Sequence, residues 1–537
     1  MPKITINDKE IEVADGTTVI QAAQQAGFDI PHYCYHPDLP VDGNCRMCLV
    51  EVEKMPKLPP SCTTVATEGM IVRTNTDKVK EAVRGVLEFL LINHPVDCPV
   101  CDQAGECRLQ DYYMVYGLHT SEIPLEMKVR KRKVIDLGPM VVLDQERCVL
   151  CSRCIRFFDH VTGTGEMQFF GRGDHVAIGT FEDRPLDNPY SGNVVDICPV
   201  GALTSRDFRF KCRVWFLHST DSVCGGCSTG CNVRIDHRDG TIFRLLPRRN
   251  VDVNKSWLCD EGRLSFHELQ DQRLVRPLSK GRDGLHAPIS WAEAIDSIES
   301  QLKDARAAYG PESILGFASP SATNEALFLF KRYLSEQFGV TQFEFRLDSE
   351  DQNVTKKEDD ILRHLDKHPN SMGAMKLGLA GEGAGGIQTA IAAAQAGRIR
   401  TGVIICLRPL VARPEDQEAE ARLGELVRSL EYSVVLASHR ADWQSDASLL
   451  LPVAAWSEEE GTYTNFQGRV QLAGRALRPM GEALPVWDVF AKLLYAGGVK
   501  QLWLSTDDVF ATMTEAVPAY REIKLEQTRL PGVLVAQ

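Results

Sequence analysis

The sequence predicts an α+β protein of several domains, and three observations lead to this prediction. The chain has 537 residues, which corresponds to roughly three or four domains of ordinary size. Fifteen of its 17 cysteines fall into four groups, all before residue 260, in loops between short strand-like and helix-like segments. After Cys259 the cysteines nearly disappear, and longer helical and strand patterns alternate, which is typical of an α/β domain with a largely parallel sheet.

The N-terminal segment predicts a strand hairpin, a helix and a cysteine loop. Apolar and polar side chains alternate on both sides of the turn 7–9, which favours two paired strands. The predicted elements are strands at 3–6, 10–14 and 48–52 and a helix at 18–26 capped by Thr17 or Thr18. This order is typical of a ferredoxin-like, β-grasp domain.

Residues 75–93 predict a long helix that ends beside a candidate ligand. Apolar side chains recur on one face of this helix, at Val79, Val83, Val86, Leu87 and Leu90. The pattern stops at His94-Pro95, since proline disfavours helical backbone in the residue before it. We therefore expect His94 where the helix ends.

The C-terminal half predicts alternating helices and strands. Ser290 and Glu293 have the spacing of a capping box, and they open a helix with Ile295, Ile298 and Leu302 inward. Further elements are expected at 313–317 (strand), 323–334 (helix), 387–396 (helix), 402–407 (strand), 414–430 (helix) and 433–437 (strand). The polar stretches 128–133 and 345–370 are expected to be exposed connections.

Composition argues against several classes of function. The net charge of −13 argues against nucleic acid or anionic lipid as the main partner. The N-terminus lacks the charged head and apolar core of a signal peptide, and no run approaches the roughly 18 apolar residues of a membrane span. We therefore expect a cytoplasmic protein that meets a membrane only through partner subunits.

Sixteen residues form four sets of metal-ligand type. In a long chain without a secretion signal, cysteines in C-x2-C groups indicate metal binding rather than disulfides. Each set offers the four soft donors that one iron–sulfur cluster needs. The sets are Cys34, Cys45, Cys48 and Cys62; His94, Cys98, Cys101 and Cys107; Cys148, Cys151, Cys154 and Cys198; and Cys224, Cys227, Cys231 and Cys259. The remaining Cys212 and Cys406 occupy strand-like contexts, where small buried hydrophobic side chains are expected.

The first and second sets differ in how specific their spacing is. C-x10-C-x2-C-x13-C can wrap a [2Fe–2S] cluster, and the histidine-free Cys45-Arg-Met-Cys48 loop excludes a Rieske centre, although zinc stays an alternative. H-x3-C-x2-C-x5-C suits zinc equally well, and only the neighbouring sets favour [4Fe–4S]. Because a neutral imidazole replaces a thiolate, we expect His94 to raise the reduction potential of that cluster.

The third and fourth sets carry stronger patterns. C-x2-C-x2-C with the remote Cys198-Pro199 is the bacterial ferredoxin pattern, and Cys198 completes the same cluster because no other triplet is free. C-x2-C-x3-C-x27-C resembles the cluster-binding segment at the start of molybdopterin oxidoreductases, with zinc again the alternative. Gly43, Arg46 and Gly105 lie in the cluster loops, where close backbone approach is expected.

A G-x-G-x-x-G segment at 381–386 is not expected to bind a dinucleotide. Such a site needs a strand before the glycines and an acidic residue about 20 positions later. Arg408-Pro409 follows the next predicted strand, and no acidic residue stands there.

Two loops and two later segments carry a family resemblance. PHYCYHPDLPVDGNCRMCLVEVE, HPVDCPVCDQAGECRLQD, CVLCSRCIRF and VDICPVGALTSRDFRFK resemble the family of large iron–sulfur subunits, the G subunits, of bacterial respiratory complex I (NADH:quinone oxidoreductase). ISWAEAIDSIESQL, SATNEALFLF, AGRIRTGVII and EEEGTYTNFQGRVQ are similar, more weakly, to a molybdopterin oxidoreductase domain. Fewer than 280 residues follow Cys259, so the resemblance implies a shortened, non-catalytic domain without the molybdenum cofactor.

The resemblance implies a domain order and a set of cofactors. The implied domains are a [2Fe–2S] ferredoxin-like domain at 1–78, a His(Cys)3-ligated [4Fe–4S] domain at 79–118, a ferredoxin-like [4Fe–4S] domain at 140–212, a [4Fe–4S] domain of molybdopterin-oxidoreductase type at 217–273 and a degenerate α/β domain at 274–537. One [2Fe–2S] and three [4Fe–4S] clusters are implied, and no catalytic acid, base or nucleophile.

The resemblance also implies a path and partners. Electrons from NADH enter through a flavin subunit and pass from the Cys34 set to the Cys148 set and then to the His94 set. A ferredoxin-like cluster subunit and quinone follow, other peripheral-arm subunits surround the chain, and the complex lies on the cytoplasmic side of the inner membrane. The Cys224 cluster is implied to be structural.

Two other functions stay open. The chain could be the electron-transfer subunit of a soluble NAD-linked hydrogenase or formate dehydrogenase, or a zinc-stapled scaffold that carries no electrons. Molybdenum, tungsten, iron and sulfide analyses distinguish these functions.

Overall fold

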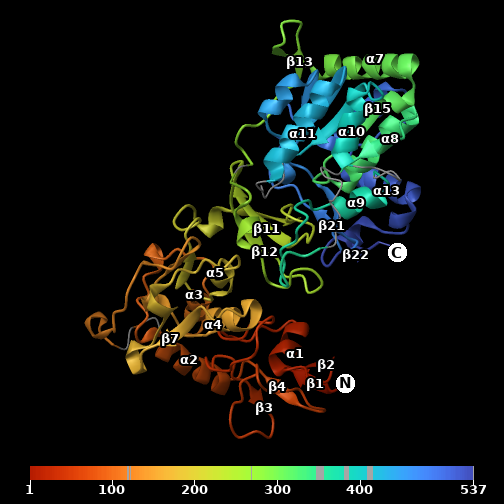
Figure 1. The fold of residues 1–537 in the computed structure, drawn as a ribbon. Helices are drawn as coiled ribbons and strands as arrows, with labels where there is room; N and C mark the ends of the chain where they lie inside the picture. Colours follow the sequence, from red (N-terminus) through yellow and green to blue (C-terminus); the bar gives the residue numbers. More distant parts are fainter. Residues whose placement is uncertain are drawn as a thin grey trace. The chain divides into compact units, whose positions relative to one another are not determined.

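The computed structural model describes residues 1–117, 120, 123–267, 269–345, 356–379, 386–407 and 415–535. The chain divides into two compact units, Met1–Leu217 and His218–Gln537 (Figure 1). In the described residues no helix combines the length and the apolar character that a membrane crossing requires.

The first unit begins with a four-stranded sheet covered by one helix. The strand order is β2-β1-β4-β3, with β1 antiparallel to β2 and parallel to β4. Asn7 and Asp8 turn the hairpin with left-handed backbone angles (φ 45° and 69°). Val19 and Ile20 of the helix are buried against the sheet residue Ile4, which completes the predicted β-grasp arrangement. The elements are β1 (Lys3–Ile6), β2 (Lys9–Glu12), α1 (Val19–Gln25), β3 (Glu51–Val52) and β4 (Ile71–Arg73).

A long amphipathic helix, α2 (Asp77–Leu91), follows the sheet. It begins at Thr76, whose hydroxyl accepts the backbone N–H of Val79 at 3.3 Å. Val79, Val83 and Leu87 are fully buried, so the predicted apolar face is the packed face. The helix ends three residues before His94, as the proline after that histidine predicts.

Small elements complete the first unit. Short helices accompany an antiparallel sheet, β5-β6-β9, and a hairpin, β7-β8. The elements are α3 (Arg108–Tyr116), β5 (Ile135–Asp136), β6 (Val141–Leu143), α4 (Arg153–Phe157), β7 (Met167–Phe170), β8 (Ala177–Thr180), α5 (Asn193–Ile197) and β9 (Leu203–Ser205).

The second unit opens with an antiparallel three-stranded sheet and a short helix. These are β10 (His218–Val223), β11 (Asn232–Arg238), β12 (Thr241–Pro247) and α6 (Asp260–Leu264). A second antiparallel sheet is formed by β20 (Gly461–Thr464), β21 (Arg469–Ala473) and β22 (Val533–Leu534).

A seven-stranded sheet forms the centre of the second unit, in the order β14-β13-β19-β18-β17-β15-β16. The five strands from β19 to β16 are parallel, and β13 and β14 join as an antiparallel edge. The bounds are β13 (Leu278–Lys280), β14 (His286–Pro288), β15 (Ile314–Ala318), β16 (Phe343–Glu344), β17 (Thr401–Cys406), β18 (Tyr432–Ala437) and β19 (Leu449–Pro452).

Helices cover both faces of this sheet, because neighbouring strand residues point to opposite sides. Val403 and Ile405 pack with α7, α8 and α12, whereas Ile404 packs with α10 and α11 (Figure 1). The predicted α/β architecture is therefore confirmed. The helices are α7 (Trp291–Tyr309), α8 (Asn324–Phe338), α9 (Ser371–Lys376), α10 (Gly386–Gln395), α11 (Glu415–Ser429), α12 (Val486–Ala496) and α13 (Thr506–Ala516).

Two local predictions were wrong. The expected strand 48–52 shrinks to β3, because Pro59 and Pro60 stand opposite its first residues and proline has no N–H for the ladder. Cys212 is not in a strand but in a half-buried loop, and its neighbour Arg213 donates to the carbonyl oxygen of Cys101.

Candidate metal centres

The four thiols of the first set lie together in the described loops of the first unit. The thiol of Cys34 is hydrogen-bonded to those of Cys45 and Cys62, and Cys62 is also hydrogen-bonded to Cys48. These contacts lower the pKa of Cys34 and raise that of Cys62. Gly43, with φ +74°, donates its backbone N–H to Cys34, so its left-handed backbone serves the predicted close approach.

The histidines beside Cys34 have other partners. The ring Nδ1 of His32 lies 2.7 Å from the carbonyl oxygen of Ile30, and burial lowers the pKa of this histidine to about 4. The ring Nδ1 of His36 accepts the backbone N–H of Asp38 at 3.2 Å. These contacts hold both rings to their own loop.

All four donors of the second set line one pocket. His94, Cys98, Cys101 and Cys107 surround it together with Gly201. Burial lowers the pKa of His94 to about 4, so its imidazole is neutral, the form that binds metal. Burial raises the pKa of Cys107 to about 12. A methyl group on Gly201 would come within 2.3 Å of the Cys101 sulfur, so only glycine fits this wall.

Cationic side chains surround the second set. Arg147 is buried and binds Asp97 through two hydrogen bonds, Nε to Oδ1 at 3.1 Å and Nη2 to Oδ2 at 2.8 Å. The Nζ of Lys128 donates to the carbonyl oxygens of His94 at 2.8 Å and of Leu91 at 2.9 Å. Residues 128–133 were expected to form an exposed connection. This prediction was wrong at Lys128, which is half-buried and bound to the backbone near the second set.

The third set lies in the chain segment between β6 and β9, with Cys151 and Cys154 buried and Cys148 and Cys198 half-buried. Burial raises the pKa of Cys148 to about 12 and of Cys151 to about 11. The backbone N–H of Leu150 donates to the Cys148 sulfur at 3.4 Å, and three backbone N–H groups after Cys198 donate to its sulfur. Cys148, Cys151 and Cys198 belong to one hydrophobic core, so the remote cysteine packs with the C-x2-C-x2-C loop.

One packed core joins the first three sets. The N–H of Arg108 donates to the carbonyl oxygen of Pro199 at 3.1 Å, which links the second set to the third. The Nδ2 of Asn44 donates to the carbonyl oxygen of Leu150 at 3.3 Å, which links the first set to the third. The same hydrophobic core contains Cys34, Cys45, Cys107, Cys148, Cys151 and Cys198.

The fourth set belongs to the second unit. Cys224 follows β10 and Cys231 precedes β11, and the N–H of Cys224 donates to the carbonyl oxygen of Cys231 at 2.7 Å. Cys259 caps α6 and accepts the N–H of Gly262 at 3.3 Å. A pocket is lined by Cys224, Cys227, Cys231 and Cys259. A Cβ on Gly262 would lie 3.2 Å from the Cys224 sulfur, so the wall is closely fitted.

A segment expected on the surface instead packs against the fourth set. Ser228 donates its N–H to the carbonyl oxygen of Asp366 at 2.9 Å, and the Thr229 hydroxyl donates to that of Leu362 at 2.6 Å. Lys367 lines the cysteine pocket and forms ion pairs with Glu261 (3.3 Å) and Glu358 (2.9 Å). The prediction for 345–370 was wrong in its last third, because these polar groups have buried partners; residues 346–355 lie outside the described part.

The donor sets fit iron–sulfur clusters chemically. Each offers four thiols, or three thiols and a neutral imidazole, and backbone N–H groups point at the sulfurs. In the described ranges, no three His, Cys, Asp or Glu side chains converge tightly enough to hold a single metal ion. In the second and fourth sets the donors stand around a pocket.

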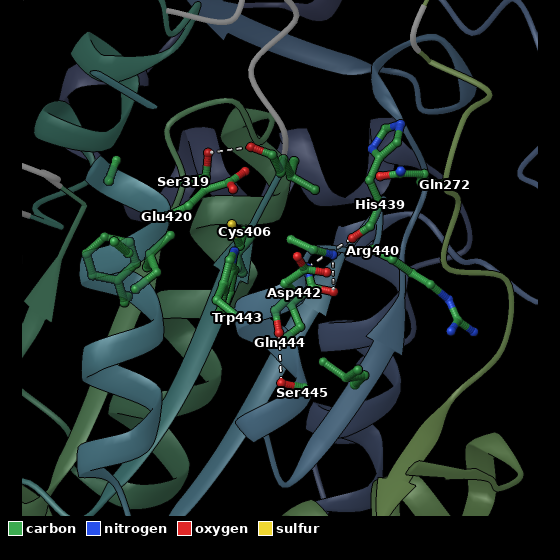
Figure 2. A pocket seen from close by; sticks show the side chains of 18 of the residues that line it. Gln272, Ser319, Cys406, Glu420, His439, Arg440, Asp442, Trp443, Gln444 and Ser445 are labelled. Carbon is green, nitrogen blue, oxygen red and sulfur yellow. Dashed lines mark hydrogen bonds between the residues drawn. The ribbon is translucent and has the colours of Figure 1, made fainter. Parts of the chain in front are cut away.

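A cavity of about 1080 Å³ lies at the carboxyl ends of the parallel strands in the second unit. Figure 2 shows Ser319, Glu420 and Cys406 on one wall and His439 on another, with the Arg440 guanidinium turned away. Cys406 ends β17 half-buried, so its sulfur faces the cavity and is not the enclosed group that was expected. Most of the G-x-G-x-x-G segment, 381–385, lies outside the described residues.

Several supporting residues were missed from the sequence. Gly201, Arg147, Arg153, Arg156 and Lys367 follow no ligand spacing, although the three arginines stand next to or two residues from a third-set cysteine. That adjacency was the available signal, but it does not say which loop a long side chain reaches.

Five known families match successive parts of the chain. Their descriptions are "2Fe-2S iron-sulfur cluster binding domain" (residues 2–77), "NADH-ubiquinone oxidoreductase-G iron-sulfur binding region" (84–122), "NADH-quinone oxidoreductase subunit 3, ferredoxin-like domain" (138–204), "NADH-ubiquinone oxidoreductase NDSU1/NuoG-like, 4Fe-4S domain" (217–267) and "Molybdopterin oxidoreductase" (273–361 and 352–496). The chain therefore carries 2Fe-2S and 4Fe-4S domains and a C-terminal molybdopterin-oxidoreductase-like domain.

Curated relatives share these features. The G subunit of the NADH-quinone oxidoreductase of Rickettsia bellii is 43% identical over 353 residues, 65% of this chain and 51% of the relative. The NADH-ubiquinone oxidoreductase 75 kDa subunit of Reclinomonas americana is 40% identical over 376 residues, 69% of this chain and 53% of the relative. The chain thus spans about half the length of these relatives.

A solved structure is also similar in part. A chain described as "Crystal structure of NAD+-reducing [NiFe]-hydrogenase in the H2-reduced state" is 30% identical, with a TM-score of 0.36. The match covers 40% of this chain and 91% of that chain.

Proposed function

Because this chain belongs to the family of NADH-quinone oxidoreductase G subunits, we propose that it relays single electrons toward quinone as the large iron–sulfur subunit of a respiratory NADH:quinone oxidoreductase. Its partners are a flavin-bearing NADH-binding subunit, a ferredoxin-like cluster subunit and other peripheral-arm subunits. It meets the membrane through these partners, on the cytoplasmic side.

The proposed ligands are the sixteen residues of the four sets. The first set holds a [2Fe–2S] cluster, and the other three sets hold [4Fe–4S] clusters, in domains 1–78, 79–118, 140–212 and 217–273. An iron–sulfur cluster supplies the reversible uptake of one electron. The chain's own groups bury the sites, exclude water and donate N–H groups to sulfur. We propose no molybdenum cofactor in domain 274–537 and no acid, base or nucleophile.

The observation that supports this proposal most is the single core shared by the first three sets. A hydrogen bond between Arg108 and Pro199 links the loops of the second and third sets. A hydrogen bond between Asn44 and Leu150 links the loops of the first and third sets. Electrons tunnel only over short spans of protein, so ligand loops in mutual contact suit a relay. We propose the order first, third, second, which puts the doubly contacted third set in the middle.

Metal and sulfide analysis of anaerobically purified full chain tests the proposal. We expect about 14 iron atoms per chain, a similar amount of acid-labile sulfide and no stoichiometric zinc. After dithionite reduction, low-temperature EPR is expected to show signals of both cluster types. A colourless, EPR-silent protein containing zinc would instead establish a non-redox scaffold.

The assembled complex tests the partner proposal. NADH is expected to reduce the clusters only when the flavin-bearing subunit is present. Reduction of the purified complex by hydrogen, or stoichiometric molybdenum or tungsten, would favour the hydrogenase or formate dehydrogenase alternative.

A further inference from the structure

Two arginines beside the cysteines of the third set are buried without a carboxylate partner in the described residues. Arg153 and Arg156 belong to α4 and expose only 6% and 8% of their surface. In the described part of the chain, every hydrogen-bond acceptor of these guanidinium groups is a carbonyl oxygen or the Ser152 hydroxyl. Asp42 is reached only through that hydroxyl. Burying a cation costs several kcal/mol unless a negative group compensates it.

Arg156 connects a ligand of the first set to a ligand of the third. Its Nη2 donates to the carbonyl oxygen of Cys34 at 2.5 Å and to that of Cys151 at 3.3 Å. Its Nη1 donates to the carbonyl oxygen of Pro40, in the first-set loop. One guanidinium fork therefore fixes the backbone of both sets, a geometry that the single ammonium of lysine cannot reproduce.

Arg153 also connects the first set to the third, through the residues next to one cysteine of each set. Its Nη2 donates to the carbonyl oxygen of Tyr35 at 2.5 Å, and its Nη1 to that of Ile197 at 3.0 Å. Tyr35 follows Cys34, and Ile197 precedes Cys198. The buried Nε has no hydrogen-bond partner within the described residues. Two like charges thus lie side by side between two sets of thiols.

We propose that Arg156, supported by Arg153, is a positioning cation shared by the first and third clusters. A thiolate-ligated iron–sulfur core is an anion, and it gains a further negative charge on reduction. The first and third iron–sulfur clusters therefore supply the missing negative charge. In return, the two guanidinium groups favour the reduced form of each of these clusters. This inference rests on the proposed function.

The step concerned is the transfer of one electron from the reduced first cluster to the oxidised third cluster. No bond forms or breaks, and no proton moves. The reductant is the flavin of the NADH-binding partner in the complex and dithionite in the test. Arg156 contributes by holding the two ligand backbones together and by balancing charge at both ends.

Redox titration of the full chain, followed by EPR, tests the proposal with Arg156→Gln. We expect the reduced-to-oxidised ratio of both the first and the third cluster to fall at least tenfold at fixed potential, a shift of 59 mV for a one-electron couple. The second and fourth clusters are expected to keep their midpoints. Arg156→Lys, which retains the charge, is expected to restore at least half of the shift.

Arg172→Gln is the matched control, because it removes one positive charge from an exposed site of the same unit. It is expected to leave all midpoints unchanged. Midpoints of the first and third clusters that stay within threefold of the original ratio in Arg156→Gln would overturn the inference. If Arg156→Gln does not accumulate, titration of Arg153→Gln decides on the same criterion.

The outcomes separate this inference from the proposed function. A wild-type chain without iron and sulfide contradicts the proposed function itself. A chain with all four clusters and unshifted midpoints in Arg156→Gln contradicts only the shared-cation inference.

Discussion

The N–H of Arg108 donates to the carbonyl oxygen of Pro199 at 3.1 Å, although the two residues are 91 positions apart in the sequence. Arg108 follows Cys107 of the second set, and Pro199 follows Cys198 of the third. This peptide-to-peptide bond makes the two ligand sets neighbours. Because it uses only backbone atoms, only a proline at position 108 would remove it directly, and the predictions below address the groups around it.

Replacing His94 by cysteine is expected to lower the midpoint potential of the second cluster. A thiolate adds a negative charge where burial now holds a neutral imidazole. The expected shift is on the order of 100 mV, because two histidines in Rieske centres raise the potential by about 250 mV or more. EPR-monitored titration checks this, with exposed His175→Cys as the control. An unchanged or higher midpoint contradicts it.

Gly201→Ala is expected to abolish the second cluster and to spare the fourth. The new methyl group would lie 2.3 Å from the Cys101 sulfur and 3.1 Å from the Cβ of Gln103. Iron analysis should show a loss of about four atoms per chain, and EPR should identify the missing cluster. Gly85→Ala is the control, because a Cβ there meets nothing within 4 Å and alanine stabilises helix α2 by about 1 kcal/mol. Full iron content in Gly201→Ala would refute this account of the pocket wall.

Cys259→Ala is expected to remove the fourth cluster without stopping reduction of the other three. The fourth pocket is lined by residues of the second unit, whereas the other sets share a core in the first. The same variant should lower the thermal unfolding temperature, because metal binding contributes folding free energy. In the assembled complex, NADH should still reduce the first three clusters. Loss of that reduction would show that the fourth cluster lies on the electron path.

Glu459 is expected to make the second unit less stable as pH rises. Burial raises its pKa from 4.5 to about 8, so the folded state holds a proton that the unfolded state releases above pH 4.5. The contribution of Glu459 to the free energy of unfolding is therefore complete below about pH 4.5 and is lost as pH rises to 8. Glu459→Gln should remove this loss, worth roughly 4 kcal/mol at pH 9 relative to pH 4.5.

Denaturant unfolding at several pH values checks the Glu459 prediction. The neighbouring Glu460→Gln is the control, because Glu460 is exposed. A pH dependence that is the same in wild type and Glu459→Gln would contradict the assignment. The buried Glu325, whose pKa burial raises to about 7, contributes a second, smaller dependence of the same sign.

Local patterns predicted most of the elements because they depend on nearby residues. The capping box of Ser290 and Glu293 forms as the spacing predicts, and α7 buries Ile298 and Leu302. The predicted parallel strands are β15, β17 and β18 in the sheet. Local patterns predicted the wrong structure where a segment contacts a residue far along the chain. Examples are the shortened strand, where Pro59 lies opposite Val50, and the buried end of 345–370, where Asp366 binds Ser228.

The sequence by itself determined the spacing of the four predicted donor sets, the α/β character of the second half and the family resemblance, because cysteine spacing and hydrophobic period are local. Only the tertiary structure decided that the second and third sets touch, that Gly201 forms the wall beside Cys101 and that Arg156 joins Cys34 to Cys151. These relations depend on which distant loops pack together. That packing follows from burying a whole core at once, which no short window of sequence contains.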